Sequence, residues 1–439
     1  MKNWKIYPYN HLYRTPEKEL INELISSLEG IDVSTSINKI FHASETDRNL
    51  INILMRVFPI GTKRGNLLMS VAEAILRIPD NKKKNELVSQ LKIPLLPVNL
   101  VRFSTELFVS LLAKTMIAGD SIEWLKFIMA SGRSDLASYD MLGESAVTPQ
   151  QAEDYFQKYR NAAKVIEAPA EISIKLSSLH PRYEYLKQAE CVPAIREKMR
   201  RIMVICRDRG IDVTIDAQES DRLDLSMMVI DVIAQEGLTV AVQANQKRAT
   251  GVIKYLNSLG VPIGVRLVKG AYWDTEIKMA QERGLDYPVF TSKENTNISY
   301  LACAKLMLEC KNIIPKFATH NPSTVGAILG LTKNKVEFQR LHGMGEKLHR
   351  LIQEMGYPSR IYKPIGEGKN LLAYLIRRMI ENGANTSFIM HEKMENHLET
   401  GKEIPSYKSL YSRPNSSGLD FSNPVTLNEL EEYHDWKRN

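Results

Sequence analysis

The sequence predicts an α/β protein built on a (β/α)8 TIM-like barrel that follows a helical region. After about residue 135, eight short apolar runs rich in β-branched residues alternate with longer amphipathic segments, over roughly the length that such a barrel needs. A doubly wound open sheet is the alternative. The GxGxxG fingerprint of a nucleotide-binding open sheet is absent, since GMG at 343–345 is too short and follows a different kind of element. This favours the barrel.

The composition is that of a globular protein, with 44% hydrophobic and 25% charged residues among 439. The net charge of +7 is dispersed, and the densest basic run, NKKKN at 81–85, is typical of a solvated loop. Because neither a concentrated basic face nor a recognisable binding module accompanies this run, we expect no nucleic-acid partner.

The cysteines, the histidines and the first residues indicate a cytoplasmic protein without a metal. The spacings of the four cysteines and nine histidines match no metal site. The opening MKNWKIYPYNHLYR lacks the apolar stretch of a signal peptide, and no apolar run approaches the roughly 18 residues of a membrane span. Any membrane contact is therefore expected to be peripheral, at the inner face of the cell membrane.

Residues 1–135 are expected to form a helical arm and a helical domain. Apolar residues recur at helical spacing in 47–58, 64–81 and 106–119, and Pro79 ends the second of these runs. We see no catalytic loop in this region, so we expect it to pack on the barrel.

The barrel is assigned to residues 136–390, and a C-terminal tail to 391–439. Helices are expected at 192–210 and 295–311, among other places. Glycines that can end a helix, Gly210, Gly237 and Gly260, precede the third, fourth and fifth strands. The eight predicted strands are 138–142, 171–179, 212–217, 238–244, 263–270, 316–320, 336–341 and 360–366.

Polar side chains gather at the carboxyl ends of these strands, where the active site of a barrel lies. Each has a structural explanation when taken alone: Arg266 could pair with Asp216 inside the barrel mouth, and His320 could be a core histidine. Six successive strands with such ends are harder to explain, because buried charges without a ligand are costly. The residues are Lys175, Asp216, Gln243, Arg266, Lys269, Thr319, His320, Arg340 and His342.

A predicted helix at 370–385 adds two neighbouring arginines. Tyr374 lies three and four positions before Arg377 and Arg378, so it neighbours both on the helix surface. The arginines could be ordinary surface residues that Glu381 neutralises. The functional alternative is a paired guanidinium clamp for a carboxylate, with Tyr374 covering an apolar ring.

Taken together, these motifs resemble the proline dehydrogenase domain of the bifunctional proline utilisation A flavoenzymes. The resemblance runs from about residue 45 to the C-terminus. The matching blocks are SYDMLGE (138–144), ISIKLSSLHPRYE (172–184), TIDAQESDRLDLS (214–226), VQANQKRA (242–249), VRLVKGAYWDTE (265–276), FATHNPSTV (317–325), EFQRLHGMGE (337–346), RIYKPIG (360–366) and LLAYLIRRMIENGANTSF (371–388).

The resemblance implies that a barrel holding FAD oxidises L-proline to Δ1-pyrroline-5-carboxylate, by hydride transfer to flavin N5, and that the electrons pass to a membrane quinone. It also implies a role for each matching residue. Asp216 and Arg266 would be catalytic. The substrate would contact Lys175, Tyr272, Leu341, Tyr362, Tyr374, Arg377 and Arg378. The cofactor would contact Ala217, Gln243, Arg266, Lys269, Gly270, Ala271, Trp273, Thr319 and His320.

The chain departs from the family at both ends. We expect it to lack the ribbon-helix-helix module with which many members begin, because the helical arm leaves no room for it. Its last residues, 415–439, resemble the linker to an aldehyde dehydrogenase domain that does not follow, so a separate pyrroline-5-carboxylate dehydrogenase stays open as a partner. Two other functions also stay open, a scaffolding module that binds proline, and a barrel enzyme that binds a phosphorylated ligand through the cation-rich rim.

Overall fold

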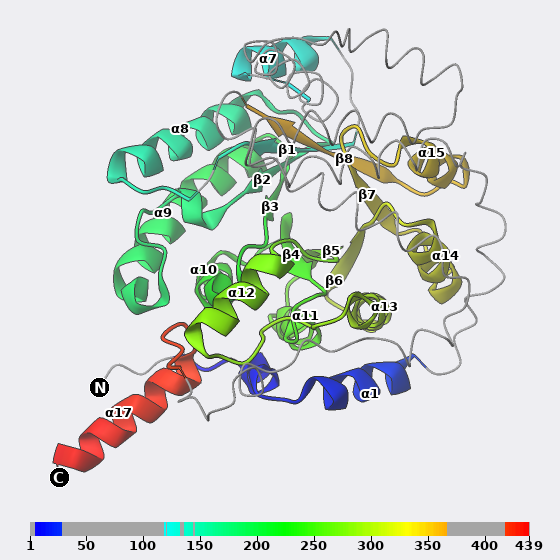
Figure 1. Ribbon diagram of the computed structural model, residues 1–439. Coiled ribbons are helices and arrows are strands. Elements are labelled where there is room, and N and C mark those ends of the chain that lie inside the picture. Colours follow the sequence, from blue (N-terminus) through cyan, green and yellow to red (C-terminus); the bar gives the residue numbers. More distant parts are fainter. Residues whose placement is uncertain are drawn as a thin grey trace, which may run out of the picture.

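A computed structural model describes residues 5–28, 118–119, 121–131, 136–143, 145–366 and 418–438. Within them, eight parallel strands form a closed barrel in sequence order, so the predicted barrel is confirmed and the open sheet is excluded (Figure 1). The strands are β1 (Ala137–Met141), β2 (Glu171–Ile174), β3 (Asp212–Ile215), β4 (Leu238–Gln243), β5 (Ile263–Val268), β6 (Ile313–Ala318), β7 (Glu337–Leu341) and β8 (Ser359–Ile365). The last strand closes on the first, with Tyr139 opposite Lys363.

Helices surround the barrel, as Figure 1 shows. Side chains cap several of their first turns: Thr148, Ser292 and Asn321 accept hydrogen bonds from backbone N–H groups three residues on. The α-helices are α7 (Ile122–Ala130), α8 (Pro149–Val165), α9 (Gln188–Asp208), α10 (Leu223–Ile233), α11 (Ala249–Ser258), α12 (Trp273–Arg283), α13 (Lys293–Glu309), α14 (Pro322–Leu331) and α15 (Glu346–Glu354).

The helices expected at 192–210 and 295–311 are present as α9 and α13. In α9, Ile195, Met199 and Ile202 are fully buried, which gives the helix one apolar face against the barrel. Gly210 follows this helix with a φ of 66°, a conformation that a residue with a Cβ adopts at a cost.

Most strand boundaries differ from the prediction by one or two residues, and two of them differ by more. The second strand stops at Ile174 and not at 179, because Leu176–Ser178 turn into a 3-10 helix. The sixth strand begins earlier than predicted, at Ile313, and includes Pro315, a residue type that usually argues against a strand. Both differences lie at strand ends, so they do not change the topology.

The apolar core lies between the sheet and the helices. Ile172, Val213, Leu267 and Phe338 are fully or almost fully buried on this outer face of the strands. Because side chains alternate along a strand, the neighbouring positions face the barrel interior. Many of those positions are polar or charged, including Ser138, Asp140, Glu171, Ser173, Arg266, Lys316 and Gln339, and all are buried.

The N-terminal segment runs along the outside of the barrel. It contains a 3-10 helix, η1 (Pro8–Tyr13), and α1 (Glu17–Ser27), which packs on α13 (Figure 1). A C-terminal helix, α17 (Pro424–Arg438), extends away from the barrel and is joined to this segment by an exposed ion pair between Arg14 and Glu429.

Four predicted helices cannot be compared in full. Those at 47–58, 64–81 and 370–385 lie outside the described residues, and so does the one at 106–119 up to residue 117.

Candidate active site at the carboxyl ends of the strands

An acid–cation cluster lies at the carboxyl ends of β1, β2, β3 and β8. We call Asp140, Lys175, Asp216 and Tyr362 the rim cluster. Lys175 Nζ donates to both carboxylate oxygens of Asp140, at 2.9 and 2.8 Å, and lies 3.9 Å from Asp216 Oδ2. The Tyr362 hydroxyl donates to Asp216 Oδ2 at 2.7 Å. Four strands thus bring two acids, a cation and a phenol together.

Arg266 lies below this cluster, inside the barrel. Each of its nitrogens donates to the protein: Nε to Gln339 Oε1, Nη1 to Asp216 Oδ1 and Ser173 Oγ, and Nη2 to Glu171 Oε1 and Ser138 Oγ, at 2.7 to 3.1 Å. The five N–H groups of a guanidinium are therefore all engaged. The expected pairing of Arg266 with Asp216 is present.

A second group of charges continues toward the amino ends of the strands. We call Glu171, Arg266, Lys316, Glu337 and Arg360 the lower cluster. Glu171 accepts from Lys316 Nζ at 2.9 Å as well as from Arg266, and Arg360 donates to both oxygens of Glu337 at 2.9 Å. Burial would raise the pKa of Glu171, but Lys316, Arg266 and Arg360 lower it well below its usual range. Glu171 is therefore a carboxylate.

The pKa values in the rim cluster shift because its members are buried together. Burial raises the pKa of Asp216, although Arg266 and Lys175 act in the opposite direction. Burial alone would lower the pKa of Lys175, but Asp140 and Asp216 raise it above its usual value. Burial also raises the pKa of Tyr362 far above its usual value. Lys175 is thus a cation and Tyr362 a neutral phenol at neutral pH.

The turn after β5 has an unusual backbone. Gly270 has a φ of 124°, and Tyr272 has a φ of 66°, which is rare for a residue with a side chain. Trp273 Nε1 donates to the Phe290 carbonyl at 2.8 Å, and Lys269 Nζ donates to Asn297 Oδ1 at 2.7 Å. Aromatic and cationic side chains from one strand end are thereby held in place.

Gln243 and Asn245, at the end of β4, face this turn. Gln243 Oε1 accepts from the Ala271 N–H at 2.9 Å, and its Nε2 donates to the Gln218 carbonyl at 2.8 Å. Asn245 Oδ1 is buried and has no hydrogen-bond partner among the described residues. A buried oxygen of this kind calls for a donor beyond the described residues, such as a water molecule or a ligand.

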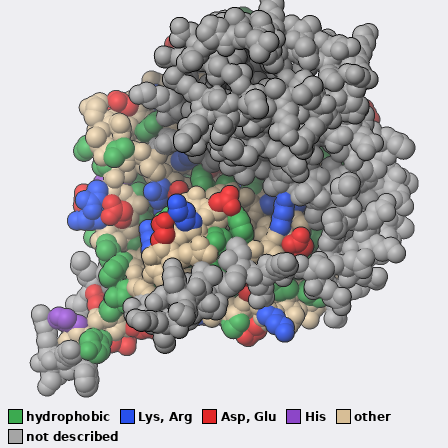
Figure 2. Space-filling model, in the orientation of Figure 1, with side chains coloured by type: hydrophobic (Ala, Val, Ile, Leu, Met, Phe, Trp, Pro, Cys, Tyr) green, Lys and Arg blue, Asp and Glu red, His purple; other side chains and the backbone are tan. Residues whose placement is uncertain are grey.

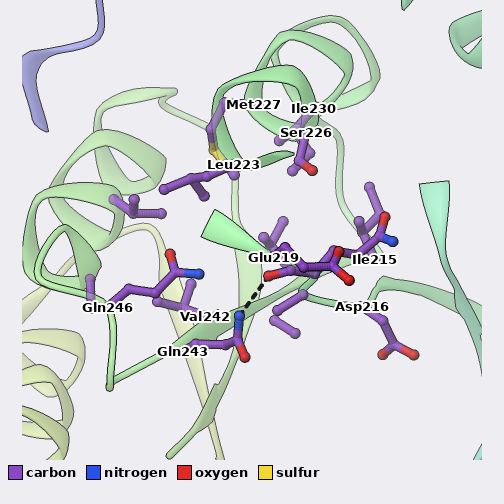
Figure 3. A pocket seen from close by; sticks show the side chains of 16 residues that line it. Ile215, Asp216, Glu219, Leu223, Ser226, Met227, Ile230, Val242, Gln243 and Gln246 are labelled. Carbon is purple, nitrogen blue, oxygen red and sulfur yellow. Dashed lines mark hydrogen bonds between the residues drawn. The ribbon is translucent and has the colours of Figure 1, made fainter. Parts of the chain in front are cut away.

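A small cavity lies behind this edge, between β3, β4, α10 and α11, and Figure 3 shows its lining. Its volume is about 30 Å³, room for little more than a water molecule. Ala217 and Gln243 line it, whereas the Asp216 carboxylate points away from Leu223 and Met227 on α10. This cavity is too small for an amino acid or a flavin, so the rim cluster is the better candidate site.

The ends of β6 and β7 hold two histidines. His320 Nε2 accepts from the Leu341 N–H at 3.0 Å, so in the neutral ring the proton is on Nδ1. His349 is buried against Ser359 Oγ at 2.8 Å and the Thr319 carbonyl at 3.0 Å, and burial lowers its pKa to about 4. These contacts fix the backbone of Thr319 and the ring of His320.

The structure thus gathers most of the predicted site residues at one end of the barrel. Tyr374, Arg377 and Arg378 lie outside the described residues. Sequence reasoning missed Asp140, Glu171, Gln339 and Asn245. The first three are isolated polar residues in apolar strands at positions that alternate with buried apolar ones, and this alternation could have identified them.

No group of three or more possible metal ligands occurs among the described residues, and none of the described helices is long and apolar enough to cross a membrane. On the face in Figure 2, the described Lys and Arg side chains are interspersed with Asp and Glu and do not form one basic patch.

Comparison with known proteins gives two family matches. Residues 129–391 match the proline dehydrogenase family, and residues 50–122 match a family described as the DNA-binding domain of proline dehydrogenase. The second match runs against the expectation that nucleic acid is not a partner.

Individual relatives match three quarters of the chain or more. The bifunctional protein PutA of Escherichia coli is 32% identical over 95% of this chain, and that of Rhizobium meliloti is 35% identical over 76%. A crystal structure of Bradyrhizobium japonicum proline utilization A has a TM-score of 0.68 at 30% identity and covers 97% of the chain. The chain spans 40%, 31% and 50% of these three proteins.

Proposed function

The chain belongs to the proline dehydrogenase family, and from this premise we propose that it oxidises L-proline to Δ1-pyrroline-5-carboxylate. The observation that supports this most is the rim cluster: a partly exposed, charged Lys175 and a neutral Tyr362 at the carboxyl end of a closed barrel. An amino acid needs a cation for its carboxylate and flat walls for its ring.

We assign Lys175, Arg377 and Arg378 to the proline carboxylate. Tyr272, Leu341, Tyr362 and Tyr374 are assigned to the walls of the ring pocket. Asp216 orders this set, because it accepts from Tyr362 and Arg266 and attracts Lys175. We also propose the predicted division of the chain into a helical region at 1–135, the catalytic barrel at 136–390 and a tail at 391–439.

FAD is the proposed cofactor, and the residues of the barrel edge fit such a group in two respects. Asn245 Oδ1 is a buried acceptor without a partner among the described residues, beside the Gly270 turn. Cations from β2 and β5 also gather there, and they favour a group that gains negative charge. When bound, the flavin supplies the acceptor for the hydride that leaves the proline ring carbon beside nitrogen.

The residues proposed to hold FAD are Ala217, Gln243, Arg266, Lys269, Gly270, Ala271, Trp273, Thr319 and His320. Two of them have limited hydrogen-bonding capacity left. All five N–H groups of Arg266 are engaged with the protein, so it contributes positive charge and not a free donor. The amide of Gln243 already joins Gln218 to Ala271, so it acts mainly by holding the turn.

Partners follow from the same proposal. The electrons would pass to a membrane quinone through peripheral contact with the inner face of the cell membrane, and the product would pass to a pyrroline-5-carboxylate dehydrogenase. Pelleting with quinone-containing liposomes, with and without proline, tests the membrane contact. Recovery of the protein in the supernatant in both cases would argue against it.

A flavin spectrum tests the central proposal. We expect the purified protein to be yellow and its flavin absorbance to bleach when L-proline is added without oxygen. Bleaching that D-proline does not cause would show that the site distinguishes the two stereoisomers. A colourless protein that FAD does not reconstitute would refute the proposal, and a yellow protein that L-proline does not bleach would refute the substrate.

The guanidinium clamp is tested separately. Arg377→Met or Arg378→Met should raise the KM for proline at least about tenfold, as expected for losing a charge-assisted hydrogen bond, while the flavin stays bound. Unchanged KM values in both variants would show that another group holds the carboxylate.

Binding of nucleic acid is a second candidate, because residues 50–122 match the family described as a DNA-binding domain. That segment carries ten Lys and Arg against five Asp and Glu. Binding through phosphates should weaken steeply as salt rises. A mobility-shift titration of duplex DNA at low and moderate salt is the test, and no shift at low salt would remove this candidate.

A further inference from the structure

The N-terminal segment Tyr7–Ser27, which we call the strap, is joined to the barrel by a buried arginine. Arg248 is almost fully buried, and its Nη1 donates to Asp224 Oδ2 at 2.8 Å. Asn10 of the strap donates to the other oxygen of Asp224 at 3.1 Å. The guanidinium also lies 4.6 Å from the ring centre of Tyr13. The strap thus surrounds a charge that belongs to the barrel.

From Arg248 a chain of hydrogen bonds leads to the turn after β5. Arg248 Nη2 donates to the Ser220 carbonyl at 2.7 Å. The N–H and the hydroxyl of Ser220 donate to the two carboxylate oxygens of Glu276, both at 2.6 Å. Glu276 lies in the first turn of α12, where its own N–H donates to the Tyr272 carbonyl at 2.8 Å.

A second anchor of the strap reaches the same turn by another route. Glu17 Oε1 accepts from the N–H and hydroxyl of Thr291, at 2.9 and 3.1 Å, and from Asn295 Nδ2 at 2.7 Å. The residue before Thr291 is Phe290, whose carbonyl accepts from Trp273 Nε1 at 2.8 Å. In Figure 1 the strap, in blue, lies beside α11 and α13.

The two routes end on consecutive residues, Tyr272 and Trp273. Tyr272 has the left-handed backbone that a residue with a Cβ adopts only when its surroundings impose it. We propose that the strap positions this turn, and that Glu17, Arg248 and Glu276 are positioning residues for the proline and flavin walls. The assignment of the walls rests on the proposed function, whereas the coupling of strap to turn does not.

The simpler alternative is that the strap only adds stability. A third anchor of the strap provides a control that distinguishes positioning of the turn from added stability alone. Asp231 on α10 accepts from the hydroxyls of Tyr7 at 3.0 Å and Tyr255 at 2.7 Å, and also pairs with Lys5. This anchor lies at Asp231 and Tyr255, in the later turns of α10 and α11, whereas the first anchor lies at Asp224 and Arg248, where these two helices begin. Asp231→Ala is therefore a matched control for Glu17→Ala, since each removes one carboxylate that holds the strap.

Hydrogen–deuterium exchange of the purified full chain tests the coupling without relying on activity. Glu17→Ala should speed the exchange of amides in 270–276 at least about fivefold, because local opening there becomes easier. Asp231→Ala should loosen the strap itself and leave 270–276 unchanged. Glu17→Gln, which keeps one acceptor oxygen, should restore most of the protection.

Two results would overturn the proposal. The first is that Glu17→Ala speeds amide exchange in the strap but leaves it unchanged in 270–276. The second is that Glu17→Ala and Asp231→Ala speed exchange in 270–276 equally. If Glu17→Ala does not yield folded protein, the exchange of Glu17→Gln is compared with that of the wild type. Even a partial loss of protection from exchange should then appear in 270–276 before it appears in α10.

Kinetics then test the consequence for the site. Glu17→Ala should raise the KM for proline about three- to tenfold, while Asp231→Ala leaves it unchanged. An enzyme with no proline turnover in the wild type would refute the proposed function and leave the exchange result standing. Accelerated exchange in 270–276 with an unchanged KM would show that the turn does not contact proline.

Discussion

The two charge clusters of the barrel interior differ in how completely they are satisfied. In the lower cluster, Glu171 is fully buried and each cation donates to an acid: Arg266 and Lys316 to Glu171, and Arg360 to Glu337. In the rim cluster, the side chains of Lys175 and Asp216 keep 16% and 11% exposure. Asn245 Oδ1, which has no partner in the part of the chain that the structure describes, lies in the strand-end layer next to the rim. The charges of the lower cluster are therefore paired with one another, whereas the rim cluster and its surroundings can still bind a ligand.

This difference shows that buried charge alone does not mark a binding site. Arg266 is the most elaborately bonded cation of the barrel, yet its bonds are all internal. Buried ions are tolerated when partners of opposite charge and hydrogen bonds compensate their loss of hydration. What marks the rim as the candidate site is unused capacity: Lys175 and Asp216 are within reach of solvent, beside an acceptor that has no donor among the described residues.

The largest expected effect lies in the lower cluster. Glu171→Gln would leave Arg266, Lys316 and Arg360 short of one negative charge, so we expect a loss of about 3–5 kcal/mol in the free energy of unfolding. Urea unfolding followed by circular dichroism measures this. Glu197→Gln, which breaks an exposed pair with Arg200, should leave the midpoint unchanged. A loss below about 1 kcal/mol for Glu171→Gln would contradict the structural role of the lower cluster.

A smaller effect concerns pH and the upper end of β6. His349 has a pKa lowered to about 4 by burial, against a usual value of 6.5. Above pH 6.5 it is neutral in both states. As pH falls from 6.5 to 4, the unfolded chain takes up a proton that the folded protein does not, so stability declines by up to about 3 kcal/mol.

Unfolding midpoints between pH 4 and 7 measure this slope. His349→Gln keeps a donor for the Thr319 carbonyl and an acceptor for Ser359, but its side chain cannot titrate. The unfolding midpoint of this variant should therefore depend less on pH over that range. An equal slope in the variant would assign the titration to other groups. Glu171, whose pKa is lowered, loses its contribution only at more acidic pH, as pH falls below the usual range of a glutamate.

The smallest expected effect in energy, and the most specific, lies in the rim cluster. Lys175→Met should raise the KM for proline about 10- to 100-fold, which corresponds to one charge-assisted hydrogen bond of about 1.5–3 kcal/mol. Lys198→Met is the control, since Lys198 is another partly buried lysine that donates to the Ala152 and Leu179 carbonyls. If both variants leave the KM unchanged, the rim is structural like the lower cluster.

The barrel itself could be predicted because its strands are apolar, β-branched and regularly spaced. The largest errors lie where local rules conflict with tertiary pairing. The predicted sixth strand began after Pro315, whereas the observed β6 includes this proline. The predicted second strand continued through Leu176, whereas the structure has a 3-10 turn there. A single sequence does not reveal the stagger between neighbouring strands. It therefore could not show that Glu171, Arg266 and Lys316 meet although they lie on three different strands.

The candidate site was predicted less completely. Strand-end residues such as Lys175 and Asp216 follow from the general position of a barrel active site. Asp140 and Gln339 were missed because they lie before the last residues of their strands, although each is next to a buried apolar residue of the outer face. Their importance appears only once their partners across the barrel are known.

The lower cluster also determines how the barrel can fold. Its central acid, Glu171, is on β2, whereas its cations are on β5, β6 and β8. Before β5, β6 and β8 are synthesised, Glu171 has none of these counter-ions, so burying its carboxylate in a partly formed barrel would be costly. A half-barrel should therefore be unstable, and the barrel should close late and cooperatively, once β8 with Arg360 is present.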